Sequence, residues 1–382
     1  MTVPAELRTA RVAVTTVFFA NGVMNASWAP YIPHIKSDLE LSARGLGFVL
    51  LAMAFGAVAS MPAAGYLVER FGARPTLAAA VALGYAALPF VLLAPTPLAL
   101  AGVLVALGAS TGVTDVAMNA NGAAVEHRYG RPILSSLHAF WSIGAFCGAG
   151  VTALMTAAGV PAELHLVAVS ALVGTVGLFA CSRLMPATEH PAEPRSGRRT
   201  RPSRRVLGLT VIALSAFLAE GAINDWGALY LRTSEGESAT VAAAGYAVFV
   251  GSMALMRLTG DRLTAHAGRT RIVRIGTALG GGALALALLV EQPAATFIAF
   301  ACLGIGLANV FPLVVSAASR SPAPGVAIAT VTTGGYAGIL IGPPLIGFLA
   351  DASSLPAALG VIVALCVLMA SLAGLVRTEP VT

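Results

Sequence analysis

The sequence predicts an all-α membrane protein of twelve transmembrane helices, arranged as two pseudo-symmetric bundles of six. Three observations support this prediction. The 382 residues are 57% hydrophobic and only 10% charged, with a mean hydropathy of +0.84, whereas soluble domains carry roughly 25% charged residues. Twelve apolar stretches are each long enough to cross a bilayer, which takes about 20 residues. The first and seventh of these stretches share a sequence pattern.

Each predicted span ends at a short polar connection, often one that contains proline or glycine, such as APTP at 94–97. The first span is too long for the apolar core of a signal peptide and contains Asn21, Asn25 and Trp28, so we expect it to be retained. The predicted spans are residues 11–34, 44–68, 75–94, 98–125, 133–158, 163–185, 206–231, 239–260, 271–290, 294–318, 325–350 and 355–376.

The basic residues are distributed as a twelve-span topology requires, because cytoplasmic connections are enriched in Lys and Arg. The termini and alternate connections hold all 23 of these residues, Arg257 included, except Lys36, Arg44 and Arg232. We therefore expect a multi-pass protein of the cell (inner) membrane with both termini in the cytoplasm. The same distribution explains the net charge of +6 without a nucleic-acid partner.

The longest polar stretch, residues 186–205, holds six arginines and four prolines. This composition is typical of a linker, and a solvated tether is the favoured interpretation. Contact with anionic lipid headgroups is the alternative. The predicted organisation is an N-terminal six-helix bundle at 1–185, a cytoplasmic basic linker at 186–205 and a C-terminal six-helix bundle at 206–382.

The first and seventh spans contain FFANGVMNASWAPY at 18–31 and FLAEGAINDWGALY at 217–230. Both fit the pattern F-x-A-[N/E]-G-x-x-N-x-x-x-x-x-Y, in which Glu220 replaces Asn21. Because both copies open a six-helix half, we interpret them as a repeat. Parallel repeats of this kind occur in transporters whose substrate site lies between the halves near the bilayer midplane.

A second pair of stretches supports the repeat: GYLVERFGARP at 65–75 and GDRLTAHAGRTR at 260–271. The first of them resembles the loop between helices two and three of the major facilitator superfamily, G-x-L-a-D-r-x-G-r-r. Glu replaces the usual Asp, and alanine stands where a basic residue is common. The matching residues are Gly65, Leu67, Glu69, Arg70, Gly72 and Arg74.

SSLHAFWSIGAFCG at 135–148 and NDWGALYL at 224–231 resemble the fucose-permease-like branch of that family, which includes uncharacterised bacterial inner-membrane members. The resemblance implies a secondary active transporter with alternating access, most simply proton-coupled symport of a small hydrophilic, sugar-like solute. Proton-coupled efflux (antiport) of a drug-like or secreted metabolite is the alternative. A non-transporting membrane sensor is a third hypothesis.

An enzyme is not expected, since the sequence has no nucleophile–base set and no phosphate loop. The four cysteines lie in apolar runs without metal-ligand spacing, so we expect neither a metal nor a cofactor. The proton is the expected coupling ion. The expected partners are the lipid bilayer and a small-molecule solute, and the expected functional unit is a monomer.

Ionisable side chains at membrane depth cost about 2.5–3.5 kcal/mol each and therefore require a reason. Glu220, near the middle of the seventh span, is the first candidate proton carrier, and a hydrogen-bonded structural glutamate is the alternative. Asp115 is the second candidate, because it shares a helical face with Thr111 and Asn119. His138 is the third because histidine titrates near physiological pH, although a core histidine is equally consistent with the sequence.

Glu220 and Asn224 share one face of the seventh span, and the aligned asparagines share the equivalent face of the first. We expect these two faces to be opposing walls of the cavity. Asp225 points about 140° away from Glu220 on the helix, which leaves an ion pair with Arg232 and substrate contact both open. The cavity candidates are Asn21, Asn25, Trp28, Thr111, Asn119, Trp141, Asn224, Asp225, Trp226, Asn309, Thr333 and Tyr336.

Gly144-x-x-x-Gly148 and Gly338-x-x-x-Gly342 predict close approach between helices. By resemblance, the loop after the second span forms charge contacts at the cytoplasmic edge that break when the inside opens. The alternative is a simple topology signal. The predicted residues of this cytoplasmic gate loop are Gly65, Glu69, Arg70, Gly72, Arg74, Arg128 and Arg131.

Overall fold

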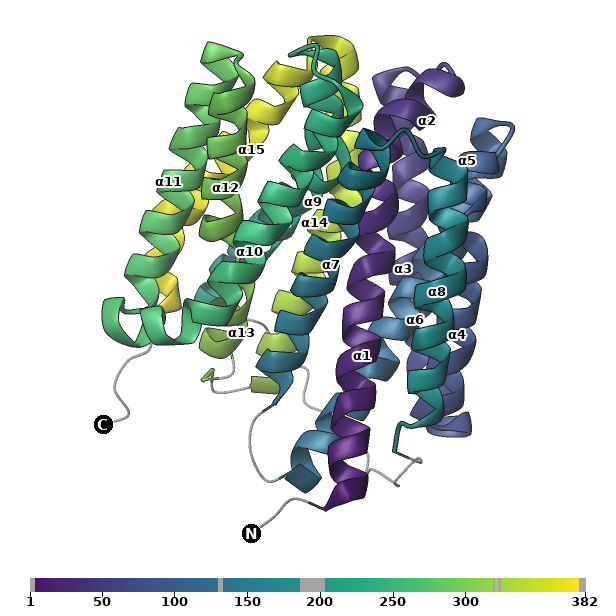
Figure 1. Cartoon of the computed structure of the whole chain (residues 1–382). Helices are drawn as coiled ribbons and strands as arrows, with labels where there is room; N and C mark the ends of the chain where they lie inside the picture. The colour runs from purple at the N-terminus through teal and green to yellow at the C-terminus, as the bar shows by residue number, and fades with distance from the viewer. Residues whose placement is uncertain (1–3, 130–132, 186–202, 319, 322–323, 378–382) are drawn as a thin grey trace. The chain divides into compact units, whose positions relative to one another are not determined.

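The computed structural model describes residues 4–129, 133–185, 203–318, 320–321 and 324–377, and these residues form helices without any strand (Figure 1). The expected linker lies outside the described residues except for its last three. The helices are α1 (Ala5–Trp28), η1 (Ala29–Tyr31), α2 (Ile32–Asp38), α3 (Ala43–Phe71), α4 (Ala73–Ala87), α5 (Phe90–Leu93), α6 (Pro97–Tyr129), α7 (Leu134–Ala157), α8 (Ala162–Ser182), α9 (Arg204–Thr233), α10 (Ala239–Ala267), α11 (Arg269–Val290), α12 (Pro293–Leu307), α13 (Val310–Ala318), α14 (Pro324–Ala352), α15 (Leu355–Leu372) and η2 (Ala373–Val376).

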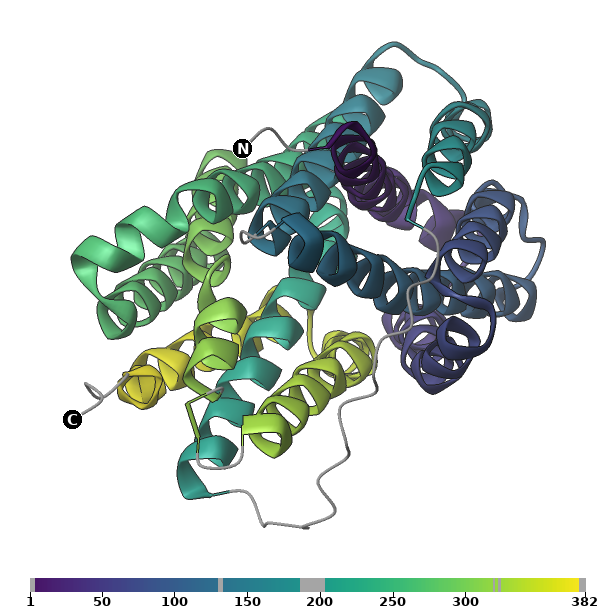
Figure 2. The same cartoon turned by 90° about the horizontal axis from the view of Figure 1, so that it is seen from below.

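The helices gather into two compact units, and Figure 2 shows the helices from below. Unit 1 comprises Met1–Leu41, Phe48–Pro191 and Ala239–Ala247. Unit 2 comprises Ser42–Gly47, Ala192–Ser238 and Val248–Thr382. The first residues of α3 therefore belong to unit 2, and the first residues of α10 belong to unit 1.

Eleven segments of the described chain are long and apolar enough to cross a membrane, with 21 to 30 residues each. They match eleven of the twelve predicted spans. The first predicted span corresponds to α1, whose 24 residues extend about 36 Å, more than the roughly 30 Å of a hydrocarbon core. Its hydropathy is low because Arg8 and Arg11 stand near its start and Asn21 and Asn25 in its second half.

In unit 1, α1 packs along α7 and also contacts α8 and α6. The predicted glycine pair on α7 provides this close approach. A methyl group on Gly148 would lie 2.7 Å from the carbonyl oxygen of Val23, and one on Gly144 would collide with the carbonyl of Phe19. The α1–α7 contact is therefore made through backbone as well as side chains.

In unit 2, α9 packs along α14 in the corresponding way. A methyl group on Gly338 would collide with the carbonyl of Leu214, whereas one on Gly342 would have ordinary contacts with Leu218. The prediction of close approach is thus confirmed on both α7 and α14, although in α14 only the first glycine of the pair requires it.

The two loop stretches that suggested the repeat have the same backbone conformation. Gly72 precedes α4 with φ 88° and ψ 158°, and Gly268 precedes α11 with φ 82° and ψ 146°. This region of backbone space is essentially restricted to glycine. The repeat predicted from sequence is therefore confirmed at these two positions in the conformation of the chain.

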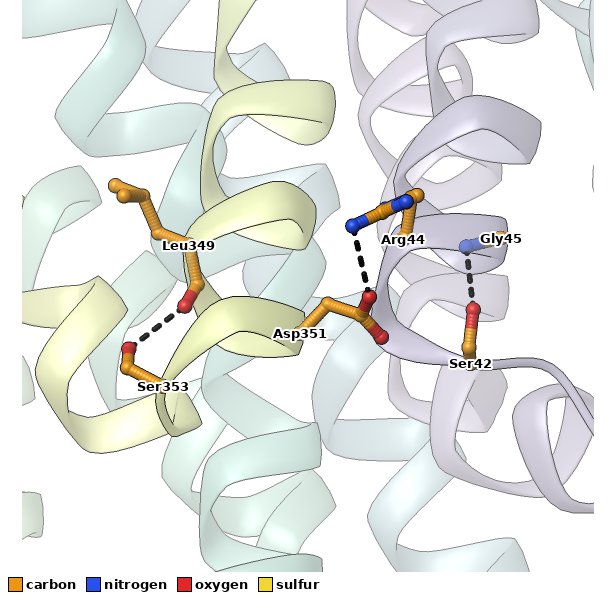
Figure 3. A network of polar contacts seen from close by, with 6 residues as sticks. All are labelled: Ser42, Arg44, Gly45, Leu349, Asp351 and Ser353. Atoms are coloured by element: carbon orange, nitrogen blue, oxygen red, sulfur yellow. Dashed lines mark hydrogen bonds and ion pairs between the residues drawn. The ribbon is translucent and has the colours of Figure 1, made fainter.

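The start of α3 meets the end of α14 within unit 2, as Figure 3 shows. Arg44 forms an ion pair with Asp351 over 3.2 Å, and its guanidinium lies 5.0 Å from the ring centroid of Phe348. Because both charged side chains are partly exposed, the pair contributes at most about 1 kcal/mol. The backbones also approach closely here, because a methyl group on Gly347 would lie only 2.7 Å from the Ala43 carbonyl oxygen.

Glu235 lies in the loop between α9 and α10, outside the spanning segments, and accepts a 2.5 Å hydrogen bond from the hydroxyl of Thr296 on α12. Burial raises the pKa of Glu235 above the ordinary value of 4.5, and the Thr296 hydrogen bond opposes this rise. A carboxyl whose pKa is raised by folding destabilises the folded state as the pH rises above that ordinary value. Glu235 therefore lowers the free energy of unfolding as the pH rises above the ordinary pKa of a glutamate.

Replacing Gly72 or Gly268 with alanine tests the shared loop conformation. Each substitution should lower the free energy of unfolding by about 1–3 kcal/mol, because alanine is strained at these dihedral angles. Gly65→Ala is the matched control, since Gly65 is helical and has open space around it; it should be neutral or stabilising by up to about 1 kcal/mol. Unfolding in mixed micelles measures all three, and equal effects at the three positions would contradict the assignment.

Candidate functional site

A hydrogen bond between side chains joins α1 to α7 in unit 1. The indole Nε1 of Trp141 donates to Oδ1 of Asn21 over 2.8 Å. Nδ2 of Asn25 donates to the main-chain carbonyl of Asn21 over 2.9 Å and lies 3.3 Å from its Oδ1. The helices come this close because Gly22 lies against the backbone of α7, where any side chain would clash. The N-G-x-x-N pattern therefore supplies both the amides and the space between the helices.

A second polar chain joins α6 to α7. Nδ2 of Asn119 donates to the main-chain carbonyl of Asp115 over 2.8 Å and to its carboxylate over 3.1 Å. Nε2 of His138 lies 3.2 Å from Oδ1 of Asn119. With the amide in this orientation, Nε2 must carry a proton, because an amide oxygen only accepts. Phe18 of α1 meets the imidazole edge-on, with ring centroids 5.2 Å apart.

His138 and Trp141 lie about one turn apart on α7. The two sets of hydrogen-bonded side chains therefore share a common face of this helix. That face combines amides, an indole, an imidazole and one carboxylate. Asn21 is almost fully buried, whereas His138 is exposed. The face therefore offers several hydrogen-bond donors and acceptors fixed by their neighbours, as sites for hydrophilic ligands do.

In unit 2, Glu220 of α9 forms an ion pair with Arg257 of α10. The carboxylate oxygen Oε1 lies 3.6 Å from a terminal nitrogen of the guanidinium, and the side chains are 19% and 22% exposed. The interpretation of Arg257 as a residue of a basic connection is therefore wrong, because it lies within the spanning part of α10. A separation of 3.6 Å is longer than the roughly 2.7–2.9 Å of a tight charge-assisted hydrogen bond, so the pair is loose.

Arg257 also has a hydrogen-bond acceptor at the break between α12 and α13. Its Nε donates to the main-chain carbonyl of Ala308 over 3.4 Å. In an unbroken helix that carbonyl would accept from the N–H four residues later, but this residue is Pro312, which has none. The proline thus leaves a polar group at membrane depth that needs a donor, and Arg257 provides one.

Aromatic side chains lie beside the ion pair. Phe217, one turn before Glu220 on α9, stacks on Phe311 of α13 with ring centroids 4.4 Å apart. Tyr336 of α14 lies 6.1 Å from Phe217 by the same measure, and Gly335 leaves room for both phenylalanines. Unit 2 therefore combines a charged pair with a half-buried aromatic surface.

Residues 14–327 match the Major Facilitator Superfamily. An uncharacterised MFS-type transporter of Yersinia pestis is 34% identical over 365 residues, which cover 94% of each chain. Membrane protein MosC of Rhizobium meliloti is 33% identical over 94% of this chain and 88% of its own length. The chain belongs to the major facilitator superfamily. It is a multi-pass membrane transporter and not an enzyme.

Solved structures agree with this major facilitator fold. A crystal structure of a variant of the nucleoside transporter NupG superposes with a TM-score of 0.74 over 97% of this chain and 100% of that one, at 15% identity. A bacterial homologue of the human lysosomal transporter Spinster, inward-facing and occupied, gives 0.68 over 98% of this chain and 97% of its own. At such low identity the likeness shows the fold alone. In this fold, α1 is the first of the twelve spanning helices.

Other cavity candidates lie elsewhere in this major facilitator transporter. Trp28 and Trp226 are buried, with 3% and no exposed surface, so each packs inside its own unit. The Thr111 hydroxyl donates to the Leu107 carbonyl of its own helix, and Asn309 donates to the Met256 carbonyl of α10.

Asn224 and Asp225 are half-buried on α9, and Thr333 is exposed on α14. Arg232, the partner that the sequence offers to Asp225, instead donates a hydrogen bond to the main-chain carbonyl of Glu237. Among the described residues, the ion pair with Arg232 that the sequence left open is therefore not formed.

The loop that matches the major facilitator motif is described only in part. Arg70 donates to the hydroxyl of Tyr66 over 2.6 Å, and Gly72 supplies the glycine conformation described above. Arg128 is exposed. The side chain of Glu69 and the whole of Arg131 lie outside the described residues, so the gate contacts implied by the resemblance stay a prediction.

Arg257 is a candidate functional residue that sequence reasoning missed, although a signal was present. It lies three residues before Gly260, within the last turn of the predicted span, where it was counted with the loop. Pro312 inside an apolar run predicts a carbonyl without its helical donor. An arginine within one span and a proline within another together indicate an interhelical contact.

Replacing Asn21 with alanine tests the α1–α7 hydrogen bond. Removing the amide deprives the indole N–H of Trp141 of its acceptor, so the free energy of unfolding should fall by about 1–3 kcal/mol. Asn25→Ala, on the same face one turn later, removes a donor but leaves the Trp141 bond intact and should cost less. Unfolding in mixed micelles distinguishes them, and an equal or larger effect at Asn25 would contradict the assignment.

Proposed function

We propose that this transporter carries out proton-coupled symport of a small hydrophilic, ring-bearing solute by alternating access, and that Glu220 carries the proton. The observation that carries the proposal is the loose ion pair between Glu220 and Arg257 inside the spanning helices. A charge pair at membrane depth is costly and is usually functional.

Proton and solute are coupled through the acceptors available to Arg257. Its guanidinium stays charged throughout, because arginine does not lose its proton in proteins. When a proton binds a carboxylate oxygen of Glu220, the carboxyl loses its charge and the ion pair is lost. A terminal N–H of Arg257 that faced the carboxylate can then donate to an oxygen of the solute. Protonation and solute binding then favour one another, which is the requirement for symport.

Each unit, taken by itself, offers contacts of a kind that a solute with hydroxyl groups and a ring uses. Asn21, Asn119 and His138 offer donors and acceptors to hydroxyls, while Phe217 and Phe311 offer an apolar surface to a ring. Sugars and nucleosides both belong to this class. The structural neighbour NupG is a nucleoside transporter, so nucleosides should be screened beside sugars.

The proposal includes an orientation with both termini in the cytoplasm of the cell, within its inner membrane. The distribution of Lys and Arg supports this orientation, with Lys36, Arg44 and Arg232 as the exceptions on the outer side. It also includes a functional monomer, since one chain carries both units. No cofactor is needed besides the proton.

Proton-coupled efflux of a drug-like or secreted metabolite is the second candidate. The stack of Phe217 on Phe311 favours it, because aromatic side chains also bind amphiphiles. The two candidates predict opposite relations between the proton gradient and solute movement. An inward proton gradient drives a symported solute into vesicles and an antiported one out of them.

Transport in proteoliposomes tests the proposal. A thermal-shift screen of sugars and nucleosides at two pH values selects the solute, with Glu235→Gln as background to remove the pH dependence of that loop. An inward proton gradient should then drive accumulation by the wild type. Glu220→Gln should lose gradient-driven accumulation by about tenfold or more, while still exchanging solute across the membrane.

Asp115→Asn distinguishes the two candidate carboxylates. It should weaken solute binding through Asn119 but keep the dependence on the proton gradient, because Glu220 is intact. Gradient-driven accumulation retained in Glu220→Gln and lost in Asp115→Asn would transfer the role to Asp115. Accumulation retained in both variants would contradict the proposal.

A further inference from the structure

A groove of about 480 Å³ lies along the contact between α11 and α15 in unit 2, two helices that run side by side in Figure 1. Its volume is within the roughly 300–1,000 Å³ of small-molecule sites. The lining is mainly apolar and lacks acidic groups. It includes Arg274, Thr277, Gly281 and Gly282 from α11 and Val363 and Val367 from α15.

The groove exists because α11 carries glycines where it faces α15. A methyl group on Gly281 would lie 2.6 Å from Cβ of Cys366, so this glycine sets the distance between the helices. Gly282 has no atom within 4 Å of the position that a methyl group would take. Gly281 thus provides contact between the helices, and Gly282 provides open space beside it.

Arg274 gives the groove a charged end. Its Nε donates to the main-chain carbonyl of Ala370 over 3.3 Å, which fixes the guanidinium beside α15. Its terminal nitrogens have no partner among the described residues. From Arg274 to Gly282 the helix rises about 12 Å, so an arginine near one end of a spanning helix leads into an apolar groove directed toward the membrane interior.

We propose that this groove binds one anionic glycerophospholipid, with its phosphate on Arg274 and an acyl chain beside Gly282 and Val367. The charge and the apolar lining match the two parts of such a lipid. A guanidinium presents paired N–H donors to phosphate oxygens, and basic pockets between spanning helices bind anionic headgroups. The exposed Arg271 and Arg377 near the same ends of the two helices add to the positive potential.

Native mass spectrometry of the purified transporter tests the site. The protein is delipidated in mild detergent and mixed with phosphatidylglycerol or with phosphatidylcholine of the same acyl chains. The wild type should retain one phosphatidylglycerol more than Arg274→Gln, with affinity lowered about fivefold in the variant, which is the fold-change equal to about 1 kcal/mol. Arg271→Gln is the matched control for charge, because Arg271 is exposed but does not line the groove, and it should resemble the wild type.

Gly282→Leu tests the acyl-chain part of the groove, since a Cβ at this position has no protein atom within 4 Å and the leucine side chain would extend into the groove. It should abolish retention of the extra lipid. Gly360→Leu on α15, also with open space but outside the groove, should retain it. A thermal-unfolding midpoint close to that of the wild type shows that each variant is folded.

Three outcomes would overturn the proposal. The first is equal retention of phosphatidylglycerol by the wild type and Arg274→Gln. The second is equal retention of phosphatidylcholine and phosphatidylglycerol, which would mean that the groove holds acyl chains regardless of charge. The third is a dimer that Gly282→Leu dissociates, because the occupant would then be a second copy of this chain, approaching through small residues.

Discussion

The transporter depends on a charge that cannot be removed. Arg257 stays protonated inside the spanning part of α10, so it must always have acceptors. They include the carboxylate of Glu220 and the carbonyl of Ala308, which Pro312 leaves without a helical donor. Each feature by itself would be unfavourable in a bilayer. Together they satisfy one another, which accounts for an arginine, a glutamate and a broken helix in one unit.

The repeat shows how one framework is used in two ways. Glycines at corresponding places bring α1 against α7 and α9 against α14, and Gly72 and Gly268 share a conformation. On this common framework, unit 1 carries amides that hold an indole and an imidazole. Unit 2 carries an acid in place of an amide, and the arginine that the acid pairs with. The framework follows from the fold, while the polar residues distinguish the units.

Much of this could be predicted from the sequence, because apolar length, basic connections and glycine spacing are local signals. The hydrogen bonds seen in unit 1 join Asn21, Trp141 and Asn119, which are predicted cavity residues, and His138, which is a predicted proton-coupling candidate. The partner of Glu220 could not be predicted in the same way, since an interhelical pair depends on tertiary packing. The burial of Trp28 and Trp226 also depends on packing, because sequence gives the face of a residue but not its neighbours.

A double-mutant cycle on Glu220 and Arg257 tests the central claim most directly. The free energy of unfolding in mixed micelles would be measured for the wild type, Glu220→Gln, Arg257→Gln and the double variant. Each single change leaves one charge without its partner, so the double variant should be less destabilised than the sum of the two, by about 1–3 kcal/mol. Effects that add to within about 0.5 kcal/mol would show that the two residues do not depend on one another.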